Sequence, residues 1–318
     1  MSTFLHFGVD VAKTAVVVAC AEGVRPLATI PNQKADLSAW LRTLPPGTRI
    51  GLEATGSYHE LLADLAHDHG FTVWLLNPKD TRHYGKAVGQ RGKTDRVDAR
   101  LIARLVAHEH RHLTPYQPPT PAQRRMQRLI KRRAKLVTVK GTLRLSLQGL
   151  TGFQADLRVL LSRLDQLIAR IDAQLDTLIA ARPEGRAAHQ RLQTIVGVGP
   201  LVAAGLLTVL ERVPFNHADA FIAFTGLDPR PKESGRLIGR RRLSKRGPGE
   251  LRRLLYNAAL AGAKTKTWKP WYDYYRSKGL PSTAALVILA RKIARIAFSL
   301  YRHNTTFDPS RISTPILT

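Results

Sequence analysis

Residues 6–14 read HFGVDVAKT, an apolar and β-branched run with a single carboxylate, Asp10, inside it. Such residues favour a strand, and similar runs predict strands at 4–11, 14–21, 27–30, 50–54 and 71–76. Amphipathic stretches between them predict helices at 35–44 and 58–69. Because three strands come first and helices then alternate with strands, the sequence predicts an α/β sheet that begins antiparallel and continues parallel.

Four carboxylates fall within or beside these elements. Asp10 and Glu53 lie in apolar runs, and Asp95 and Asp98 stand three apart at the start of an amphipathic helix, hence on one helix face. Oxygen ligands of this kind suit Mg²⁺, and two such ions can clamp both sides of a phosphodiester under attack. Each acid alone has an ordinary explanation as a cap, turn, salt-bridge or surface residue. The metal-site interpretation therefore depends on the four together.

The charge balance is strongly basic, with 50 Lys and Arg against 23 Asp and Glu, a net +27 in 318 residues. This is typical of a protein that binds polyphosphates, because cations placed on phosphates release counterions. The apolar run 15–21 is too short to span a bilayer and no lipidation signal is present, so we expect no membrane partner. One cysteine, Cys20, excludes an intrachain disulfide, and without a signal peptide we expect a cytoplasmic protein.

A proline-rich segment, TPYQPPTP at 114–121, cannot continue a helix and marks a boundary. Residues 122–181 then predict two long helices, and in the second the apolar residues from Leu157 to Leu178 alternate steps of four and three, as in a coiled-coil seam. The chain has no acid from His110 through Ala155, so we expect the first of these helices to face nucleic acid rather than only solvent. Its candidate contacts are Arg124, Arg125, Arg128, Lys131 and Arg132.

Two features of the C-terminal third concern phosphate chemistry. LQTIVGVGPLVAAGLL (192–207) has the form of a helix-hairpin-helix, in which Gly197 and Gly199 let turn amides approach a phosphate; an ordinary helix–helix turn is the alternative. Residues 230–253 then hold ten cations and two acids around Ser234 and Ser244. Guanidinium groups would orient a scissile phosphate for a serine nucleophile, whereas the alternative leaves the serines as loop or cap residues. The candidate nucleic-acid contacts here are Arg236, Arg240, Arg241, Arg242, Lys245 and Arg246.

Three further groups carry weaker signals. Residues 77–84, close in sequence to the acids, predict a mobile polar loop. The histidines at 108, 110 and 112 resemble a metal-binding tract, but a solvated helix end is the favoured interpretation. The aromatic residues at 268–275 could stack on bases, although core or interface packing is favoured.

Taken in order, six segments resemble the DEDD-type insertion-sequence transposases over nearly the whole chain: GVDVAKT, GLEATGSYH, NPKDTRHYGKAVGQRGKTDRVDA, IVGVGPLVAAGLL, FTGLDPRPKESG and RLSKRGPGELRRLLY. The resemblance implies an α/β RNase H-like (RuvC-like) domain at 1–114, a linker and α-helical coiled coil at 115–185, and a mainly α-helical transposase domain with the helix-hairpin-helix at 186–318. It also implies that Asp10, Glu53, Asp95 and Asp98 are catalytic acids that hold Mg²⁺ and that Ser234 is the nucleophile. The two domains would then form one composite site.

The resemblance implies partners as well: donor and target DNA, and a structured non-coding RNA, the bridge RNA, whose base pairing selects the DNA sequences. It further implies a homodimer through the coiled coil, with a higher assembly on DNA. The expected function is a DNA transposase that cuts and rejoins strands through a phosphoserine link. A Mg²⁺-dependent structure-specific nuclease without a covalent intermediate is the alternative, and a nonenzymatic scaffold is a third, against which the intact acids argue.

Overall fold

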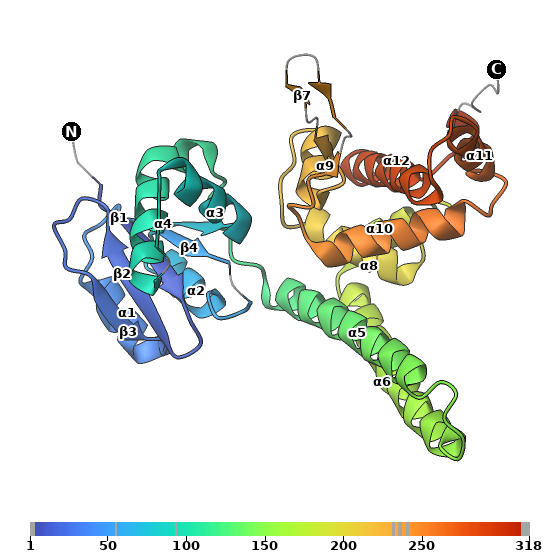
Figure 1. Cartoon of the computed structure of the whole chain (residues 1–318), viewed down its shortest axis with the longest axis horizontal. Helices are drawn as coiled ribbons and strands as arrows, with labels where there is room; N and C mark the ends of the chain where they lie inside the picture. Colours follow the sequence, from blue (N-terminus) through green and yellow to red (C-terminus); the bar gives the residue numbers. More distant parts are fainter. Residues whose placement is uncertain are drawn as a thin grey trace. The chain divides into compact units, whose positions relative to one another are not determined.

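The computed structural model describes residues 4–312 apart from Thr55, Lys93, 231–232, 235–236 and 240–241. The chain divides into two compact units, Met1–Pro118 and Pro119–Thr318 (Figure 1). Each unit has its own hydrophobic core.

The first unit contains a five-stranded sheet in the order β3-β2-β1-β4-β5. β1 pairs antiparallel with β2 and β2 with β3, whereas β1, β4 and β5 run parallel. The predicted α/β sheet, with its antiparallel beginning and parallel continuation, is confirmed. Its elements are β1 His6–Val11, β2 Ala15–Cys20, β3 Ala28–Pro31, α1 Lys34–Arg42, β4 Arg49–Glu53, α2 Glu60–Asp68, β5 Thr72–Leu76, α3 Pro78–Ala87, α4 Asp95–Glu109 and the short 3-10 helix His110–His112.

Helices cover both faces of this sheet. On one face, α1 and α2 bury Leu37 and Leu62 against Val9 and the other apolar strand residues that share its side. On the other face, Ile102 of α4 packs with Trp74 of β5. The sheet is therefore the middle layer, and α4 has one face of it largely to itself.

The segment after β5 corrects one prediction, because residues 77–84 begin a helix and do not form a polar loop. Asn77 is the N-cap of α3, and its side chain accepts a hydrogen bond from the Lys79 backbone N–H at 3.0 Å. Pro78 occupies the first helical position, where no N–H is needed. The helix escaped prediction because only Thr81 and Gly85 of its residues are buried, which leaves too few apolar residues for a periodic pattern.

The second unit is mainly α-helical, as predicted. Among the described residues, no helix has both the length and the apolar character needed to cross a membrane. The helices are α5 Pro121–Ser146, α6 Gln154–Ala180, α7 Pro183–Gln193, α8 Pro200–Leu210, α9 Ala218–Thr225, α10 Gly249–Gly262, α11 Lys269–Ser277 and α12 Ser282–His303, followed by a 3-10 turn at Pro309–Arg311.

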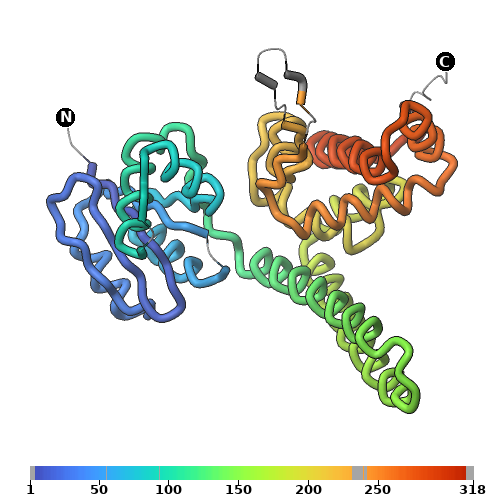
Figure 2. The backbone as a smooth tube through the Cα atoms, viewed as in Figure 1, coloured from blue at the N-terminus to red at the C-terminus, as the bar shows by residue number. Residues whose placement is uncertain are grey.

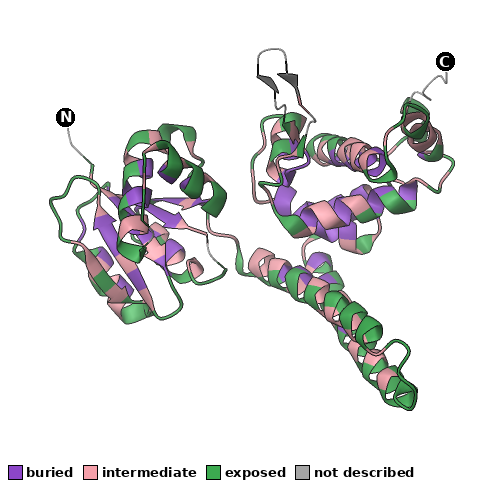
Figure 3. Cartoon of the chain, viewed as in Figure 1, coloured by how far each residue is buried: buried purple, intermediate pink, exposed green. Residues whose placement is uncertain are grey.

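Helices α5 and α6 run antiparallel, side by side, in one hairpin (Figure 2). Two ion pairs join them, Arg133 to Asp172 and Lys140 to Asp165, each with a closest N–O distance of 2.5 Å. The base of the hairpin is anchored in the core of the unit, and exposed residues become frequent toward its far end (Figure 3). The apolar seam of α6 thus packs against α5 within one chain.

The basic segment between α9 and α10 forms two short antiparallel ribbons. β6 Pro229–Arg230 pairs with β9 Arg242–Leu243, and β7 Glu233–Ser234 pairs with β8 Leu237–Ile238. Strand pairing in this segment was not predicted from its arginine-rich sequence.

Candidate active site

Two glycines let helix α4 lie directly on the sheet. Gly8 of β1 and Gly51 of β4 are paired in the parallel register. A Cβ atom at Gly8 would lie 2.0 Å from the backbone N of Ala103, and one at Gly51 would lie 2.4 Å from Cγ2 of Val106. Any larger residue would hold the helix off the strands, so these glycines set the helix–sheet distance.

This packing brings the four predicted acids toward one end of the sheet. Residues two apart on a strand share a face, so Asp10 follows Gly8 on the α4 side of β1 and Glu53 ends β4 on that same side. Helix α4 begins at Asp95, which is exposed, and Asp98 follows one turn later, half-buried. Acids in the first turn also interact favourably with the helix dipole, which gives this pair a structural role in its own right.

The charges of the four acids act on one another. The pKa of Asp10 is raised to about 6, first by burial and then by the negative charges of Asp95, Asp98 and Glu53, while a hydrogen bond from the Val11 backbone opposes the shift. The structure therefore brings the predicted acids within electrostatic range of one carboxyl group.

The geometry of this acid cluster is looser than that of a finished metal site. Among the described residues, no three His, Cys, Asp or Glu side chains lie close enough together to hold an ion. Like-charged carboxylates repel one another until a cation offsets their charge. The donor set consists only of oxygens, as hard divalent cations prefer, so the chemistry of these residues fits such a cation.

Gln90, a residue that sequence reasoning missed, holds one of the acids. Its side-chain Nε2 donates hydrogen bonds to Oδ1 of Asp98 at 3.2 Å and to the Gly92 carbonyl at 3.0 Å. The amide therefore ties the loop before α4 to the carboxylate on its first turn. A glutamine in a polar loop carries no signal in the sequence that would have distinguished it.

Asn32 was missed as well, and it links the segments that follow Asp10 and Glu53. Its Nδ2 donates to the carbonyl of Ala12 at 2.9 Å and to that of Tyr58 at 3.2 Å. One side chain at the end of β3 thus bridges the turn after β1 and the loop after β4. Its role is visible only in the tertiary structure.

The two candidate serines occupy different places in the basic segment. Ser234 is the last residue of β7, and its backbone pairs with Leu237. The hydroxyl of Ser244 hydrogen-bonds to the carboxylate of Asp228, and its backbone N–H donates to the Asp228 carbonyl at 3.0 Å. Ser244 therefore joins the two strands at the base of the β6–β9 ribbon, a structural task that accounts for its presence.

The predicted nucleic-acid contacts of α5 lie mostly at the surface. Arg125, Arg128, Lys131 and Arg132 are exposed and Arg124 is half-buried. In the basic segment, Arg242, Lys245 and Arg246 are exposed, whereas Arg236, Arg240 and Arg241 lie outside the described residues.

The two glycines of the predicted hairpin turn differ in their surroundings. Gly197 has a φ of +94°, and a Cβ atom there would lie 2.4 Å from the Ala258 carbonyl, so its backbone packs on α10. Gly199 is the N-cap of α8 and has open space around it. Of the two, only Gly199 is placed where a phosphate could approach.

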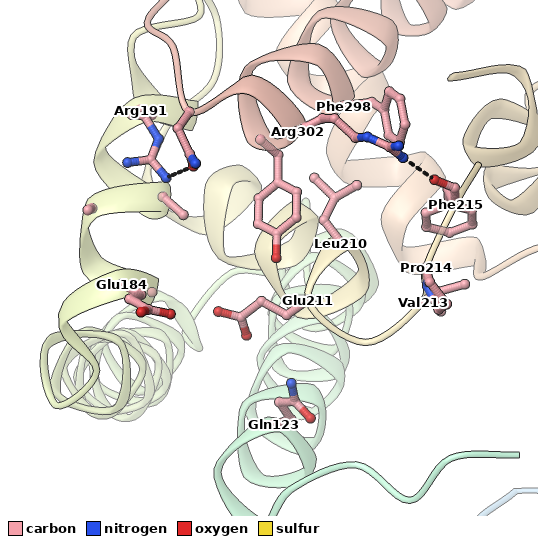
Figure 4. A pocket seen from close by; sticks show the side chains of 15 residues that line it. Gln123, Glu184, Arg191, Leu210, Glu211, Val213, Pro214, Phe215, Phe298 and Arg302 are labelled. Carbon is pink, nitrogen blue, oxygen red and sulfur yellow. Dashed lines mark hydrogen bonds between the residues drawn. The ribbon is translucent and has the colours of Figure 1, made fainter. Parts of the chain in front are cut away.

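A separate hollow of about 820 Å³ lies in the second unit, between α7, α12 and the segment after α8 (Figure 4). Its wall carries Arg191, which donates to Asn304 at 2.8 Å, and Arg302, which donates to the Phe215 carbonyl at 3.0 Å. Glu211 lies in the same hollow and is paired with Arg182 at 2.7 Å. None of the predicted catalytic residues whose side chains the structure describes lines this hollow.

Comparison with known proteins adds to this geometry. Residues 7–151 match a family model described as transposase, of the DEDD type, and residues 189–276 match the transposase IS116/IS110/IS902 family. A pilin gene-inverting protein of Moraxella lacunata is 28% identical over 285 residues, which cover 86% of this chain and 87% of that protein. A probable family 20 transposase of Pseudomonas aeruginosa is 28% identical, covering 87% and 90% of the two chains. The transposase for insertion sequence element IS1328 of Yersinia enterocolitica is 26% identical, covering 95% and 98%.

The acid-bearing α/β unit, the helical unit and these matches define a DNA transposase. Within that class, the chain belongs to the IS116/IS110/IS902 family of DEDD-type insertion-sequence transposases. The predicted family is thereby confirmed.

Proposed function

We propose that this transposase cuts and rejoins DNA strands with Ser234 as nucleophile and with a divalent-cation site made by Asp10, Glu53, Asp95 and Asp98. The observation that carries the proposal is the convergence of three acids on Asp10, whose negative charges add to the effect of burial in raising its pKa to about 6. Like charges gathered in a half-buried place cost stability unless a cation offsets them, and function is the usual reason to retain such an arrangement.

Mg²⁺ is the cation we propose, because all four side chains offer only carboxylate oxygens. When bound, it would neutralise charge on the phosphate under attack and polarise it. Two residues of the chain would position the acids for this cation. Gln90 orients Asp98 by donating to its carboxylate, and Asn32 holds the turn after β1 beside the loop after β4.

In the proposed reaction, the Ser234 hydroxyl attacks the phosphorus of a DNA phosphodiester. A bond forms between the serine oxygen and phosphorus, and the bond from phosphorus to one sugar oxygen breaks, so that this sugar leaves with a free hydroxyl. The phosphoserine ester conserves the energy of the broken bond, and attack by another sugar hydroxyl rejoins a strand and releases the serine. Hydrolysis by water would instead leave a broken strand.

Cations of the same basic segment support phosphate binding at this step. Arg230 and Arg242 are directly opposed in the β6–β9 pair. Like charges at opposed positions of an antiparallel pair destabilise it, so a phosphate between them would relieve the repulsion. The exposed arginines of α5 would hold DNA elsewhere along its backbone.

The proposal includes finer points of architecture and partners. The sheet order β3-β2-β1-β4-β5 supports an RNase H-like fold for the first unit. The domain divisions 1–114, 115–185 and 186–318 are proposed from the family resemblance. A structured non-coding RNA that guides the protein to its DNA is proposed from the family resemblance alone. A homodimer is supported by Leu160 and Leu167, which are 45% and 43% exposed and stand seven apart on α6, outside the seam that packs on α5.

The deciding experiment compares Ser234→Ala with Ser244→Ala in strand exchange and in trapping of a covalent protein–DNA adduct. We expect Ser234→Ala to bind DNA normally but to form neither adduct nor recombinant product, and Ser244→Ala to lose thermal stability while still forming the adduct. An adduct mapped by mass spectrometry to Ser244, or recombination by Ser234→Ala, would contradict the assignment. Strand cleavage that persists in Ser234→Ala and never yields an adduct in wild type would favour the nuclease alternative.

A further inference from the structure

The aromatic residues around α11 separate into a core ring and a surface group. Trp268 is 1% exposed and donates from its indole N–H to the Val196 carbonyl at 2.9 Å, so packing accounts for it, as predicted. Trp271 is half-buried against the same core. Tyr274 and Tyr275 are also half-buried, one turn further along the helix. The aromatic residues that are adjacent in the sequence therefore lie in two environments: Trp268 is in the core, and Trp271, Tyr274 and Tyr275 are half-buried.

The three outer rings contact one another as a group, which we call the aromatic platform: Trp271, Tyr274 and Tyr275. The ring centroids of Trp271 and Tyr275 are 6.0 Å apart and nearly parallel, at 28°. Tyr274 stands edge-on to both, at 6.3 Å from Trp271 and 5.4 Å from Tyr275. Aromatic rings at these distances brace one another, so the platform is a preorganised surface with little side-chain freedom left to lose on binding.

Cations surround the platform. Lys292 Nζ lies 3.7 Å from the centroid of the Trp271 ring, and Lys278 Nζ lies 5.5 Å from that of Tyr274. Burial and the charge of Arg295 lower the pKa of Lys292, so a nearby anion would stabilise its charged form. The sole acid of α11, Asp273, is already paired with Lys269 at 2.6 Å. The platform therefore lies beside two positive charges, Lys278 and Lys292, that the single acid of α11 does not offset.

We propose that the aromatic platform binds single-stranded nucleic acid, with an unpaired base stacked on its rings and the flanking phosphates held by Lys278 and Lys292. Aromatic rings interleaved with cations suit such a strand, because every base has a π-face and every linkage a negative charge. A duplex cannot use the rings in this way, since its bases already stack on one another. An acidic protein segment would satisfy the lysines but leave the rings without a partner.

This inference rests on the proposed function only in assuming that the transposase handles nucleic acid. It is independent of the acid cluster and of Ser234, because the platform rings belong to α11 and the two lysines to its C-cap and to α12. An unpaired strand exists wherever DNA is opened or where an RNA has loops, and the platform's chemistry accepts either. The two sources are separated by the probes used in the test.

The test measures binding of the full chain to short fluorescent single strands, oligouridylate and oligothymidylate, and to a DNA duplex of the same length. We expect Tyr274→Ala to weaken single-strand binding roughly tenfold, the order of one stacked base, and to leave duplex binding unchanged. Tyr274→Phe keeps the ring and should bind as wild type. Phe153→Ala removes an exposed ring at the α5–α6 turn and serves as the control for loss of surface aromatic area.

A preferential loss for one of the two single strands would identify RNA or DNA as the source. Equal losses for single strands and duplex, equal effects of Tyr274→Ala and Tyr274→Phe, or no effect at all would overturn the platform. Should Tyr274→Ala fail to fold, ultraviolet cross-linking of wild type to oligouridylate and oligothymidylate decides instead: a cross-linked peptide spanning 269–277 supports the proposal, and cross-links confined to other segments refute it. A wild-type chain that binds no nucleic acid of any kind would defeat the proposed function itself, whereas binding that ignores Tyr274 defeats only the platform.

Discussion

Replacing Gly8 by alanine should disturb both the packing of α4 and the acid cluster at its end. The new Cβ atom would lie 2.0 Å from the backbone N of Ala103 and 2.2 Å from the backbone O of Ala99. Both obstacles are helix backbone, which cannot turn aside as a side chain can. The helix must therefore retreat by roughly 1 Å or more, since carbon atoms do not pack closer than about 3.4–4 Å.

The substitution should lower the stability of the first unit and shift the pKa of Asp10. Overpacking of a well-filled contact costs about 1–3 kcal/mol, and a clash with backbone on this scale belongs at the upper end. In a unit of this size, each kcal/mol lowers the melting temperature by about 5 °C, so a fall on the order of 10–15 °C is expected. As α4 moves away, Asp95 and Asp98 recede from Asp10, and the pKa of Asp10 should fall from about 6 toward its ordinary value of 3.8.

Thermal unfolding in EDTA, NMR titration of the Asp10 carboxyl and strand exchange would measure these effects. Gly92→Ala is the matched control, because a Cβ atom at that position meets nothing within 4 Å in the same unit. We expect the control to melt and recombine as wild type, and Gly8→Ala to recombine poorly even at temperatures where it is folded. A Gly8→Ala variant with unchanged melting temperature and an unchanged Asp10 titration would refute the role given to this glycine.

Three further predictions concern the charge of Asp10, the hydrogen bond of Gln90 and the surface of α6. Because the folded-state pKa of Asp10 lies above 3.8, ionising it disfavours the folded state, so wild type in EDTA should lose stability as the pH rises from about 4 to about 6. Asp10→Asn should flatten that slope in thermal melts and abolish recombination; a slope equal to that of wild type would contradict this. Gln90→Leu should weaken Mn²⁺ binding measured by electron paramagnetic resonance about tenfold or more, since it removes the hydrogen-bond donor that orients the Asp98 carboxylate. Leu167→Asp should reduce self-association in sedimentation while preserving helicity, whereas Leu164→Asp should damage the hairpin within one chain; a Leu167→Asp variant that associates as wild type would remove α6 from the proposed dimer.

Much of the first unit was predictable because its strands are continuous apolar runs. Val9 and Leu52 are fully buried, and burial of that kind leaves a pattern in the residues themselves. The α3 helix lacked such a pattern, although Asn77 before Pro78 was a start signal that could have been used. Local capping chemistry was therefore informative where periodicity was not.

The supporting residues of the site were beyond prediction for a different reason. Gln90 and Asn32 act through hydrogen bonds to groups on other elements, and their own neighbours in the sequence give no sign of those partners. The division between Trp268 and Tyr274 was hidden as well, because which side of α11 meets the core depends on how the helix packs in the unit. The sequence shows which polar and aromatic side chains are present, whereas the tertiary contacts determine which of them support the site or face the surface.

The spacing of Gly8 and Asp10 follows from how α4 crosses the sheet. The helix runs antiparallel to β1 and β4: its C-terminal end meets the start of β4, where Arg49 hydrogen-bonds to Nε2 of His110 at 2.8 Å, and its middle rests on Gly8. From that middle contact to the first helical residue, Asp95, is about six residues, or about 9 Å at 1.5 Å per residue. The two residues from Gly8 to Asp10 span about 7 Å along β1 in the same direction. The first residue of α4 and the Asp10 carboxylate therefore lie at nearly the same position along the strand axis. Gly8 sets the distance of α4 from the sheet, and the Arg49–His110 hydrogen bond sets the position of α4 along the strands. Together they determine where the acids of α4 meet Asp10.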